Sequence, residues 1–406
     1  MSAKVAVVGS GPSGCYLAQS LRKLLPSSEL TLIDRLPVPY GLVRYGVAPD
    51  HQGTKAVTKQ FARLFERDDV AFVGNTHIGT DITLTELQEM FDIVVLATGL
   101  PADRSLGNAF EEVETVYGAG RITRLWNGHP DEAAFAPAIG QTVAVIGAGN
   151  VAMDIVRLLA KGEEDLVGSD AGTGSDVHHI HLIARSPANQ AKFDAAMVRE
   201  LGKIAGLTVD VPDLPEAADN KTLIELAALS GKSGDGRKAL SFHFATRPLQ
   251  PVLRGGKLSA VACASAGSEH EIPCDSIITA IGFDASKPAW RDDILSSALS
   301  ATNGHLSDGL FATGWFRRGP TGTIAENRAD AKTVAGTIAS TLEGKNATSR
   351  PGRVALLEKV GHVATDYADW QQIDEAERRA APPNRVRAKA TTTEQMLSLC
   401  SKGEQH

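Results

Sequence analysis

Residues 5–14 read VAVVGSGPSG, and this stretch decides the fold. The apolar run before Gly9 is short and rich in β-branched residues, which predicts a buried parallel strand. Gly9, Gly11 and Gly14 follow at the spacing G-x-G-x-x-G, and residues 15–25 are apolar at helical spacing. In this context the glycines allow a tight turn, close approach of the backbone to a pyrophosphate, and close packing of helix on strand. The stretch therefore predicts a strand–loop–helix unit that binds a dinucleotide.

The residue that ends the next predicted strand indicates which dinucleotide this is. That strand, ELTLIDR, brings Asp34 to a position twenty residues after Gly14. A carboxylate at this place binds the ribose 2'-hydroxyl, and it would repel a 2'-phosphate. The first loop is therefore expected to hold FAD or NAD rather than NADP.

A second stretch repeats the pattern. Residues 141–161, QTVAVIGAGNVAMDIVRLLAK, contain Gly147 and Gly149 between a predicted strand and a predicted helix. The strand after this helix ends at Arg185, where the first unit has Asp34. Because an arginine can clamp a 2'-phosphate, the two loops predict two different dinucleotides. Such a pair would set a flavin against a nicotinamide so that a hydride can pass between them.

The order of these motifs predicts an α/β fold with two Rossmann-like dinucleotide-binding domains. The FAD-binding domain is expected to be discontinuous, over 1–104 and 305–406, and the NADP-binding domain to be inserted over 105–304. Within the insertion, 207–273 is expected to form a strand-rich lobe. After about residue 345 the chain is polar and is expected to be a surface tail, partly helical.

Composition excludes several other classes of protein. The chain has 406 residues, 43 % of them hydrophobic, and a net charge of -7, so a generally basic surface for nucleic acid is not expected. No apolar run approaches the roughly 18 residues that span a bilayer, and the N-terminus enters a strand pattern without a signal peptide. The four cysteines lack a CxxC pair, which argues against a metal site or a redox-active disulfide. We expect a cytoplasmic protein with reduced structural thiols, a monomer by default, that binds no nucleic acid, membrane or metal.

Several stretches together resemble the adrenodoxin reductase family, the FAD-containing NADPH–ferredoxin reductases of mitochondria and some bacteria. They are VAVVGSGPSG (5–14), PVPYGLVRYGVAPDH (37–51), FVGNTHIG (72–79), VAVIGAGNVAMD (143–154), GWFRRGPTGTIAENR (314–328) and DWQQIDEAERR (369–379). The second and fifth are far more specific than a glycine loop, and the resemblance covers nearly the whole chain. It implies a two-domain enzyme that takes a hydride from NADPH and passes single electrons to an iron–sulfur ferredoxin. That ferredoxin would bind transiently and serve a cytochrome P450 or another oxygenase.

The fingerprints and the resemblance together give the candidate cofactor residues. Those for FAD are Gly9, Gly11, Ser13, Gly14, Asp34, Leu42, Arg44, Ile78, Ala97, Thr98, Gly99, Gly314, Trp315, Gly322, Thr323 and Ile324. Those for NADP are Gly147, Ala148, Gly149, Asn150, Val151 and Arg185.

Two further residues, His51 and Glu200, match family positions near the junction of flavin and nicotinamide. There they would orient the nicotinamide and relay protons to the reduced flavin. The alternatives are that His51 caps a turn and that Glu200 pairs with Arg199 or Lys203 on a helix face.

The chain departs from the family where the 2'-phosphate is expected. The family usually has two consecutive arginines there, in the pattern G-R-R-G-P, whereas this chain reads Ala184-Arg185-Ser186. An acid of the family pattern is also replaced, by Met197. One charge-assisted hydrogen bond is worth roughly 1.5–3 kcal/mol, so losing an arginine should loosen the selectivity for NADPH without abolishing it. NADPH stays the expected donor, with NADH as the alternative.

Some charged and polar residues fit either a functional or a structural interpretation. Arg317 and Arg318 could meet an acidic ferredoxin or be solvated surface charge. Asp154 is expected to support the framework of its helix. The histidines of HHIH, 178–181, are expected from alternation on a buried strand rather than from metal binding.

Two other functions stay open on the sequence alone. One is an NAD(P)H diaphorase that reduces a quinone or a flavodoxin with relaxed donor choice. The other, of a different class, is a redox sensor that binds flavin and nucleotide without turnover. The intact stretches GLVRYGVAPDH and GWFRRGPTG argue against the sensor. The sequence does not identify the ferredoxin, the oxygenase, the physiological direction or the oligomeric state.

Overall fold

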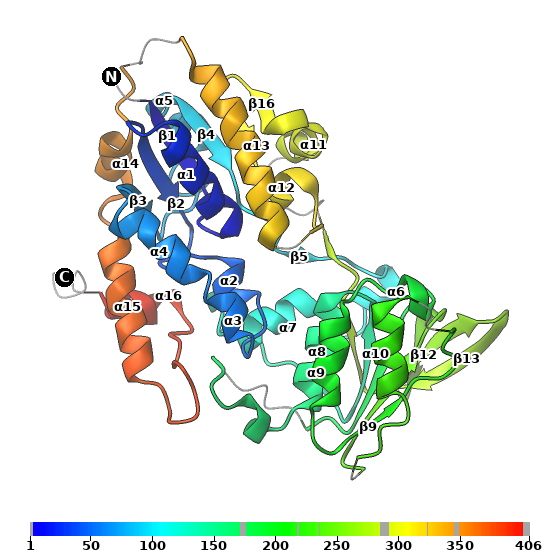
Figure 1. Ribbon diagram of the computed structural model, residues 1–406. Coiled ribbons are helices and arrows are strands. Elements are labelled where there is room, and N and C mark those ends of the chain that lie inside the picture. Colours follow the sequence, from blue (N-terminus) through cyan, green and yellow to red (C-terminus); the bar gives the residue numbers. More distant parts are fainter. Residues whose placement is uncertain are drawn as a thin grey trace. The chain divides into compact units, whose positions relative to one another are not determined.

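The computed structural model divides the chain into two compact units (Figure 1). Unit 1 comprises Met1–Ala102, Asn127–Ala133 and Asp284–His406, and unit 2 comprises Asp103–Trp126 and Ala134–Phe283. The structure describes residues 3–170, 176–216, 219–234, 236–284, 292–322, 324–344 and 349–400.

Unit 1 is built on a six-stranded sheet in the order β16-β17-β4-β1-β2-β3. Its strands are His305–Ser307, Leu310–Ala312, Ile93–Leu96, Lys4–Val8, Glu29–Ile33 and Val70–Val73. All neighbours are parallel except β16, which runs antiparallel to β17. Strand β1 lies between β2 and β4, so the chain turns to opposite sides of the sheet at the carboxyl end of β1. Such a switch point is where open α/β sheets bind ligands, and the first glycine loop lies there.

Two long helices cover one face of this sheet. Helices α1 (Pro12–Leu24) and α13 (Ile324–Leu342) pack side by side, although they lie far apart in the sequence (Figure 1). Leu17 and Leu21 of α1 and Val334 and Ile338 of α13 are fully buried in one core. This packing joins the N-terminal fingerprint to the segment that returns from unit 2.

Unit 2 repeats the same architecture around the second glycine loop. Its parallel sheet has the order β6-β14-β7-β8-β10-β9. The strands are Val116–Gly118, Ser276–Thr279, Thr142–Ile146, His179–Ile183, Lys238–His243 and Leu207–Asp210. Strand β7 lies between β14 and β8, so the second loop is again at the switch point. The predicted α/β fold with two Rossmann-like sheets is confirmed.

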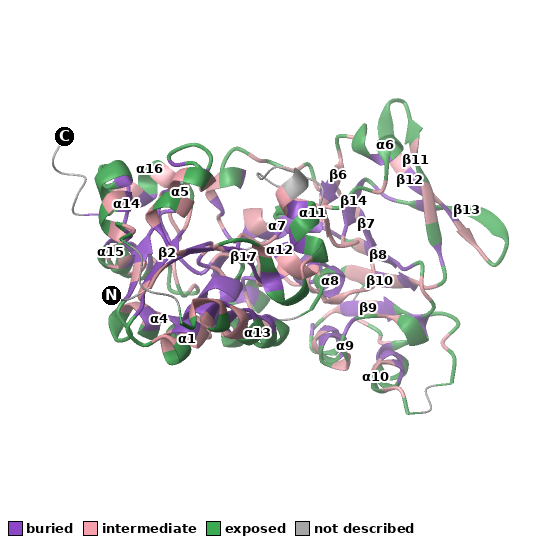
Figure 2. Cartoon of the chain, turned by 90° about the horizontal axis from the view of Figure 1, so that it is seen from above, coloured by how far each residue is buried: buried purple, intermediate pink, exposed green. Residues whose placement is uncertain are grey.

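The expected strand-rich lobe of unit 2 is an antiparallel sheet of β11 (Arg247–Arg254), β12 (Lys257–Ser265) and β13 (Ser268–Pro273). Apolar residues of β12 pack against those of the parallel sheet, while β13 is mostly exposed (Figure 2). The lobe is shorter than the 207–273 predicted, because β9, β10 and helix α10 (Lys221–Leu229) belong to the main sheet and its cover.

The chain passes between the units at β5 (Ala102–Asp103) and β15 (Phe283–Asp284), which pair as a two-stranded sheet. The return to unit 1 therefore comes earlier than the predicted residue 305. The reason is that helix α11 (Asp292–Ser300) packs on β16 and on α12 (Trp315–Arg318), both of unit 1.

Residues 127–133 also belong to unit 1 rather than to the predicted inserted domain. Asn127 accepts a hydrogen bond from Lys55 and donates one to the Val47 carbonyl, at 2.8 and 3.0 Å. The Asp131 carboxylate pairs with Arg35 at 2.6 Å. These polar contacts hold the short segment on unit 1 despite its place in the sequence.

After residue 345 the chain is partly helical, as expected, but the expectation that it is a surface tail is wrong. Helices α14 (Arg353–Val360), α15 (Tyr367–Arg379) and α16 (Thr393–Ser398) follow, and Trp370, Ile373 and Met396 are buried in the core of unit 1. Polar composition misled the prediction, because these helices bury only a narrow stripe and keep charged faces outside.

Within the described ranges, no helix combines the length and the apolar character that crossing a membrane requires.

Candidate functional site: two uncapped glycine loops

The first glycine loop is held tightly from behind. A Cβ added at Gly9, whose φ is +108°, would lie 2.5 Å from the Ala97 carbonyl oxygen. One added at Gly14 would lie 2.0 Å from the Gly9 carbonyl oxygen. Both positions therefore need glycine for the turn and for packing of α1 on the sheet, as the fingerprint predicts.

The front of the same loop is open. A Cβ added at Gly11 would meet only the Gly41 Cα, at 3.9 Å. Gly11 is also the N-cap of α1, which has no side-chain cap and no acidic residue in its first turn. A helix N-terminus with uncapped amides and open space before it favours a phosphate group.

Asp34 closes the loop from the side. Its carboxylate accepts hydrogen bonds from the Ser10 amide at 2.9 Å and from the Leu36 amide at 3.1 Å. The Ser10 hydroxyl donates to the same carboxylate at 2.5 Å. Asp34 is only half-buried, so lone pairs remain for the hydroxyls of a ribose.

The returning segment of unit 1 meets α1 at this loop. A Cβ added at Gly314 would lie 2.0 Å from the Ser13 hydroxyl oxygen. The turn at Gly314 and Trp315 therefore lies against the first turn of α1. The buried Asp330 fixes this turn, because its carboxylate accepts from the Thr313 hydroxyl at 2.8 Å and from the Gly314 amide at 2.6 Å. Candidate FAD residues from both ends of the sequence are thus brought together.

Arg317 and Arg318 are engaged within unit 1 rather than solvated. The guanidinium of Arg317 forms an ion pair with Asp330. Arg318 lies 3.6 Å from the same carboxylate and donates to the Asn327 side chain at 2.8 Å. Their charges therefore brace the turn at Gly314 and Trp315.

Two side chains around the loop fit a bound group. The Thr98 hydroxyl is buried and has no hydrogen-bond partner within the described residues. Leu42, the first residue of α2 (Leu42–Tyr45), leaves 38 % of its surface exposed, so its side chain is accessible to a bound group. Together with the uncapped α1 and the half-buried Asp34, these features fit a dinucleotide such as FAD.

The remaining candidate FAD residues differ in what surrounds them. Ile78 and Ala97 are buried, and Gly99 has open space at its Cα, with a φ of +67°. Gly322 has a φ of +88° and directly precedes Thr323, which lies outside the described residues, and Ile324 starts α13.

Arg44 is used inside unit 1. Its guanidinium is buried and pairs with the Glu377 carboxylate at 2.5 Å, with the Tyr45 and Trp370 rings each 5.0 Å away. Burial lowers the pKa of Arg44, but the Glu377 charge outweighs this effect and raises it. A guanidinium neutralised in this way is poorly placed to serve a pyrophosphate, and we leave Arg44 out of the FAD site proposed below.

The second glycine loop has the same construction. A Cβ added at Gly147 would lie 2.3 Å from the Ala280 carbonyl oxygen, whereas one added at Gly149 would meet nothing within 4 Å. Gly149 is the N-cap of α8 (Asn150–Ala160), which again has no side-chain cap. Beside it, Val151 leaves 38 % of its surface exposed. The loop is closed behind and open in front, as a phosphate requires.

Arg185 follows directly after β8 and Ala184, and it is exposed. Its side chain has no protein partner in the described part of the chain, so its donors are available for a 2'-phosphate. Ala184, at the position before it, is almost completely buried and could not be replaced by an outward-facing arginine.

A lysine that the sequence did not single out lies at this loop. The Lys192 amide donates to the Ala148 carbonyl at 2.7 Å, while its side chain is exposed and has no partner among the described residues. The neighbouring Asp194 and Asn150 hold the segment in place by reciprocal hydrogen bonds of 2.9 Å. No motif marks Lys192, because the backbone contact that brings it to the loop is visible only in the fold.

His51 and Glu200 belong to different units, and each is described within its own. His51 is the N-cap of α3 (Gln52–Lys55) without a side-chain capping bond. Glu200, on α9 (Ala195–Gly202), pairs with the buried Arg157 at 3.1 Å, and Asp154 pairs with the same guanidinium at 2.7 Å. Glu200 thus ties α9 to α8 through Arg157, not through the predicted Arg199 or Lys203, and its role at the nicotinamide stays a prediction.

The histidines of β8 form a stacked cluster. The rings of His179 and His181 are 4.1 Å apart, and His181 Nδ1 lies 3.0 Å from His243 Nε2. Burial, together with the two neighbouring imidazoles, lowers the pKa of His181 to about 3. Within the described residues no group of three or more His, Cys, Asp or Glu side chains could hold a metal ion.

The four cysteines are buried thiols. Burial raises the pKa of Cys263 to about 11, and burial together with the Asp275 charge raises the pKa of Cys274 to about 12. Thiols with such pKa values stay protonated at neutral pH and are poor nucleophiles. The site is therefore one for nucleotides, without thiol chemistry.

Comparison with known proteins agrees with two nucleotide loops in one chain. Residues 3–298 match the family of pyridine nucleotide-disulphide oxidoreductases, whose members bind FAD. The chain belongs to this family. Its match covers both glycine loops, while the buried thiols described above leave this member without the disulphide of the family's name.

Relatives within the family are reductases of redox proteins. The chain is 44 % identical to cindoxin reductase of Citrobacter braakii over 413 residues, 97 % of this chain and 90 % of that protein. It is 30 % identical to NADPH-ferredoxin reductase FprA of Mycobacterium leprae over 452 residues, 97 % of this chain and 98 % of that protein. Mycobacterium tuberculosis FprA, solved in complex with NADPH, matches with a TM-score of 0.89 and 27 % identity over 98 % of this chain and 99 % of that one.

Proposed function

We propose that this oxidoreductase is an NADPH–ferredoxin reductase, with FAD in unit 1 and NADP in unit 2. The observation that carries the proposal is the pair of uncapped glycine loops with opposite ribose chemistry, Asp34 at one and Arg185 at the other. An enzyme that bound the same nucleotide twice would have no use for this difference. The names of the relatives, which include NADPH-ferredoxin reductases, support the same reading.

In unit 1, the protein's part is to hold and orient the flavin nucleotide. The N-terminus of α1 at Gly11 would face the pyrophosphate, and Asp34 would accept from the ribose hydroxyls. Thr98 and the turn at Gly314 and Trp315 would contact the rest of the group. Bound FAD supplies the conversion between a two-electron donor and one-electron acceptors.

In unit 2, the protein's part is to select and place the nicotinamide donor. The N-terminus of α8 at Gly149 would face the pyrophosphate, while Arg185 and Lys192 would bind the 2'-phosphate as two cations from different segments. Hydride transfer needs no acid or base on the protein, only the reacting atoms held close and in line. We therefore assign His51 and Glu200 to positioning near the nicotinamide.

The acceptor class decides between this function and the alternatives. The first test is NADPH-dependent reduction of cytochrome c with a [2Fe–2S] ferredoxin, a flavodoxin, a quinone or no carrier present. We expect fast reduction with the ferredoxin and slow reduction without a carrier. Faster reduction through flavodoxin or quinone alone would overturn the ferredoxin assignment, and no turnover with any acceptor would favour the redox sensor.

Several acceptors are included because the names of the relatives differ. The relative with 44 % identity is named for cindoxin, and others are named for adrenodoxin or ferredoxin. Partner choice depends on surface charge and shape more than on the nucleotide loops. We further propose that the protein acts as a monomer in the cytoplasm, which light scattering and cell fractionation would test.

A further inference from the structure

Unit 1 has a cationic pocket that none of the residues discussed above lines. It has a volume of about 540 Å³ and lies between α1, α13 and α4 (Thr58–Glu66). Five of its lining side chains are cationic and a single one is a carboxylate; the lining residues are Tyr16, Gln19, Ser20, Arg22, Lys23, Gln60, Arg63, Arg67, Asp68 and Arg328. A net charge of -7 for the whole chain makes this local excess of positive charge notable.

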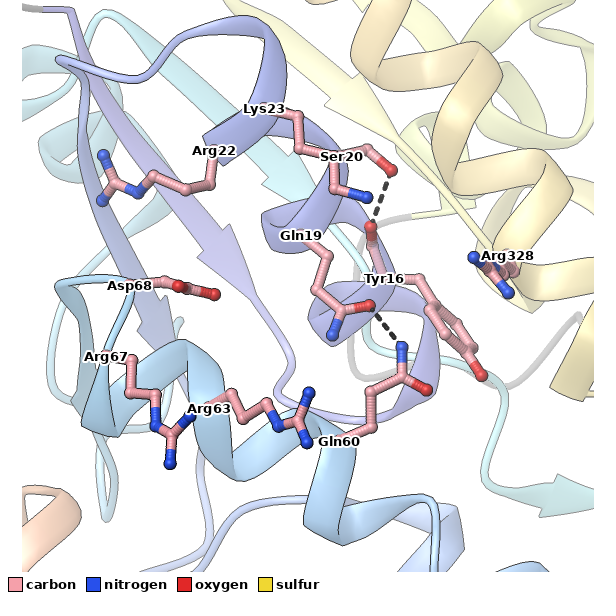
Figure 3. Close-up of a pocket in the computed structure, with 10 residues that line it drawn as sticks. All are labelled: Tyr16, Gln19, Ser20, Arg22, Lys23, Gln60, Arg63, Arg67, Asp68 and Arg328. Carbon is pink, nitrogen blue, oxygen red and sulfur yellow. Dashed lines mark hydrogen bonds between the residues drawn. The ribbon is translucent and has the colours of Figure 1, made fainter.

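Two helices present their polar faces to this pocket (Figure 3). Tyr16, Gln19 and Lys23 lie at helical spacing on α1, and Gln60, Arg63 and Arg67 follow the same spacing on and after α4. The Gln60 amide donates to the Gln19 side-chain oxygen at 3.0 Å, which fixes the two helices at the centre of the pocket. Figure 3 shows Arg328 of α13 beside the Tyr16 ring.

Four of the five cations have no anionic partner. Lys23, Arg63, Arg67 and Arg328 are exposed and form no ion pair with any carboxylate that the structure describes. Arg22 differs, because its guanidinium donates to the carbonyls of Pro26, Ser28 and Asp69.

Some other exposed arginines of the chain, in contrast to these, form ion pairs. Arg254 pairs with Glu271 at 2.5 Å, and Arg378 and Arg379 pair with carboxylates one turn away on α15 at 2.8 and 2.6 Å. A group of unpaired cations around one hollow costs free energy through mutual repulsion, which an anion would remove.

The chemistry of the lining indicates which anion. Guanidinium groups bind phosphate oxygens through two parallel hydrogen bonds, and a lysine adds a point charge. Arg63 and Arg67 are one helical turn apart, so they can bind neighbouring phosphate groups, with the Gln19 and Gln60 side chains near for further oxygens. The pocket volume lies in the range that is typical of binding sites for small molecules.

We propose that this pocket binds a small anion that carries two or more phosphate groups. The proposal goes beyond the proposed electron-transfer function and does not depend on it. The same chemistry occurs in soluble phosphate compounds and in phosphate-bearing lipid headgroups, and the experiment must distinguish these sources.

The test titrates inorganic tripolyphosphate into the FAD-loaded protein by calorimetry, with saturating NADP⁺ present to fill the second loop. The variant R63Q/R67Q should bind at least about tenfold more weakly, the loss expected for one charge-assisted hydrogen bond. R63K/R67K keeps the charge but loses the bidentate geometry, so its affinity for tripolyphosphate should lie between those of the wild type and R63Q/R67Q. R378Q/R379Q removes the same charge from an exposed helix outside the pocket and should leave the dissociation constant within about twofold.

Several outcomes would overturn the proposal. Absence of tripolyphosphate binding, or equal binding by R63Q/R67Q, would remove the site. Equal weakening by R378Q/R379Q would mean attraction by net charge alone. In a second arm, co-sedimentation with phosphatidylcholine vesicles containing phosphatidic acid, without tripolyphosphate binding, would assign the cations to a membrane surface instead. A loss of electron transfer to the carrier protein in R63Q/R67Q, without tripolyphosphate binding, would assign them to partner docking.

Discussion

At the residue scale, the end of β8 shows how little separates the two ribose sites. Asp34 directly follows β2, whereas Arg185 comes one residue later after β8, behind Ala184. Their opposite charges are the basis of the proposal that one loop takes a ribose hydroxyl and the other a phosphate. Since Ala184 is buried, Arg185 is the cation that the strand end itself provides. The exposed Lys192, brought in by a backbone contact with Ala148, supplies a second.

The first prediction concerns Arg185. Replacing it in R185Q should raise the KM for NADPH about 10- to 100-fold and leave the KM for NADH nearly unchanged, because only NADPH carries the phosphate. K192Q should act in the same direction. R199Q, which removes an exposed arginine of α9 that pairs with Glu225, is the control and should change neither KM. Equal effects of R185Q on both donors, in steady-state kinetics, would contradict the assignment.

The missing arginine can be restored at Ser186. Ser186 is half-buried, in contrast to Ala184, so S186R has room for its guanidinium outside the core. We expect S186R to lower the KM for NADPH and widen the preference over NADH by about tenfold, the value of one charge-assisted hydrogen bond. An unchanged ratio of kcat/KM for the two donors would mean that the phosphate lies elsewhere.

At the element scale, the helices after the glycine loops do most of the proposed binding. The need for glycine at Gly9 and Gly147 could be predicted from the G-x-G-x-x-G spacing, because an added Cβ at either position would collide with the backbone of a neighbouring strand end. The pairing of the turn at Gly314 with Ser13 could not, since it depends on α13 packing against α1 across most of the sequence. The burial of the helices after residue 345 in the core of unit 1 was missed because their apolar stripes are narrow.

Gly149 offers a test of the second loop that leaves the fold intact. An added Cβ meets nothing within 4 Å, so G149A should keep the thermal stability of the protein but fill the space before the helix N-terminus. We expect NADP⁺ affinity to fall at least about tenfold, as judged by calorimetry, from loss of close phosphate contacts. G336A is the matched control, because Gly336 of α13 also has nothing within 4 Å. Unchanged affinity in G149A would exclude this loop as the pyrophosphate site.

The histidine cluster of β8 and β10 predicts the pH dependence of stability. The folded protein holds the pKa of His181 near 3, whereas an unfolded histidine titrates near 6.5. The unfolded chain therefore takes up a proton that the folded chain does not, and stability falls as the pH drops from about 6.5 towards 3. Burial also lowers the pKa values of His179 and His243, which therefore act in the same sense. The His270 charge lowers the pKa of His243 further, while the Asp210 charge raises it.

The measurement is the melting temperature of wild type and H181Q between neutral pH and pH 4. We expect H181Q to lose less stability on acidification than the wild type. H178Q, which replaces the exposed neighbour of the cluster, should keep the wild-type slope. Parallel slopes for wild type and H181Q would show that His181 is protonated in the folded protein.

At the scale of the whole molecule, the chain forms two similar α/β units, and we propose that each binds one nucleotide. The C-terminal helices pack into unit 1 and contribute to its core. Glu377 of α15 is almost completely buried, pairs with Arg44 and Arg387, and accepts from the Ala390 amide at 3.1 Å. The sequence contains all these residues but gives no sign that they meet. The net charge of -7 gave no sign of the cationic pocket, because the sum of the charges does not show where on the surface the cations gather.

Removing the Glu377 charge should therefore destabilise unit 1. E377Q leaves the buried Arg44 without its carboxylate, and loss of one partner of a buried ion pair costs roughly 3–5 kcal/mol. We expect E377Q to unfold at a lower urea concentration than the wild type and to release FAD at a lower urea concentration. The FAD fluorescence measures this release. E375Q, which breaks an exposed pair with Arg379 on the same helix, should change the midpoint little. If E377Q matched E375Q, the buried pair would not stabilise the unit.

The central claim is that the FAD-loaded protein accepts a hydride from NADPH in preference to NADH. The most direct measurement is anaerobic bleaching of the flavin absorbance band over a concentration series of each donor. We predict that NADPH bleaches the band at lower concentration than NADH, because the proposed contacts of Arg185 and Lys192 with the 2'-phosphate are available to NADPH alone. Comparable curves for the two donors, or faster bleaching by NADH, would contradict the assignment of the second loop to NADP.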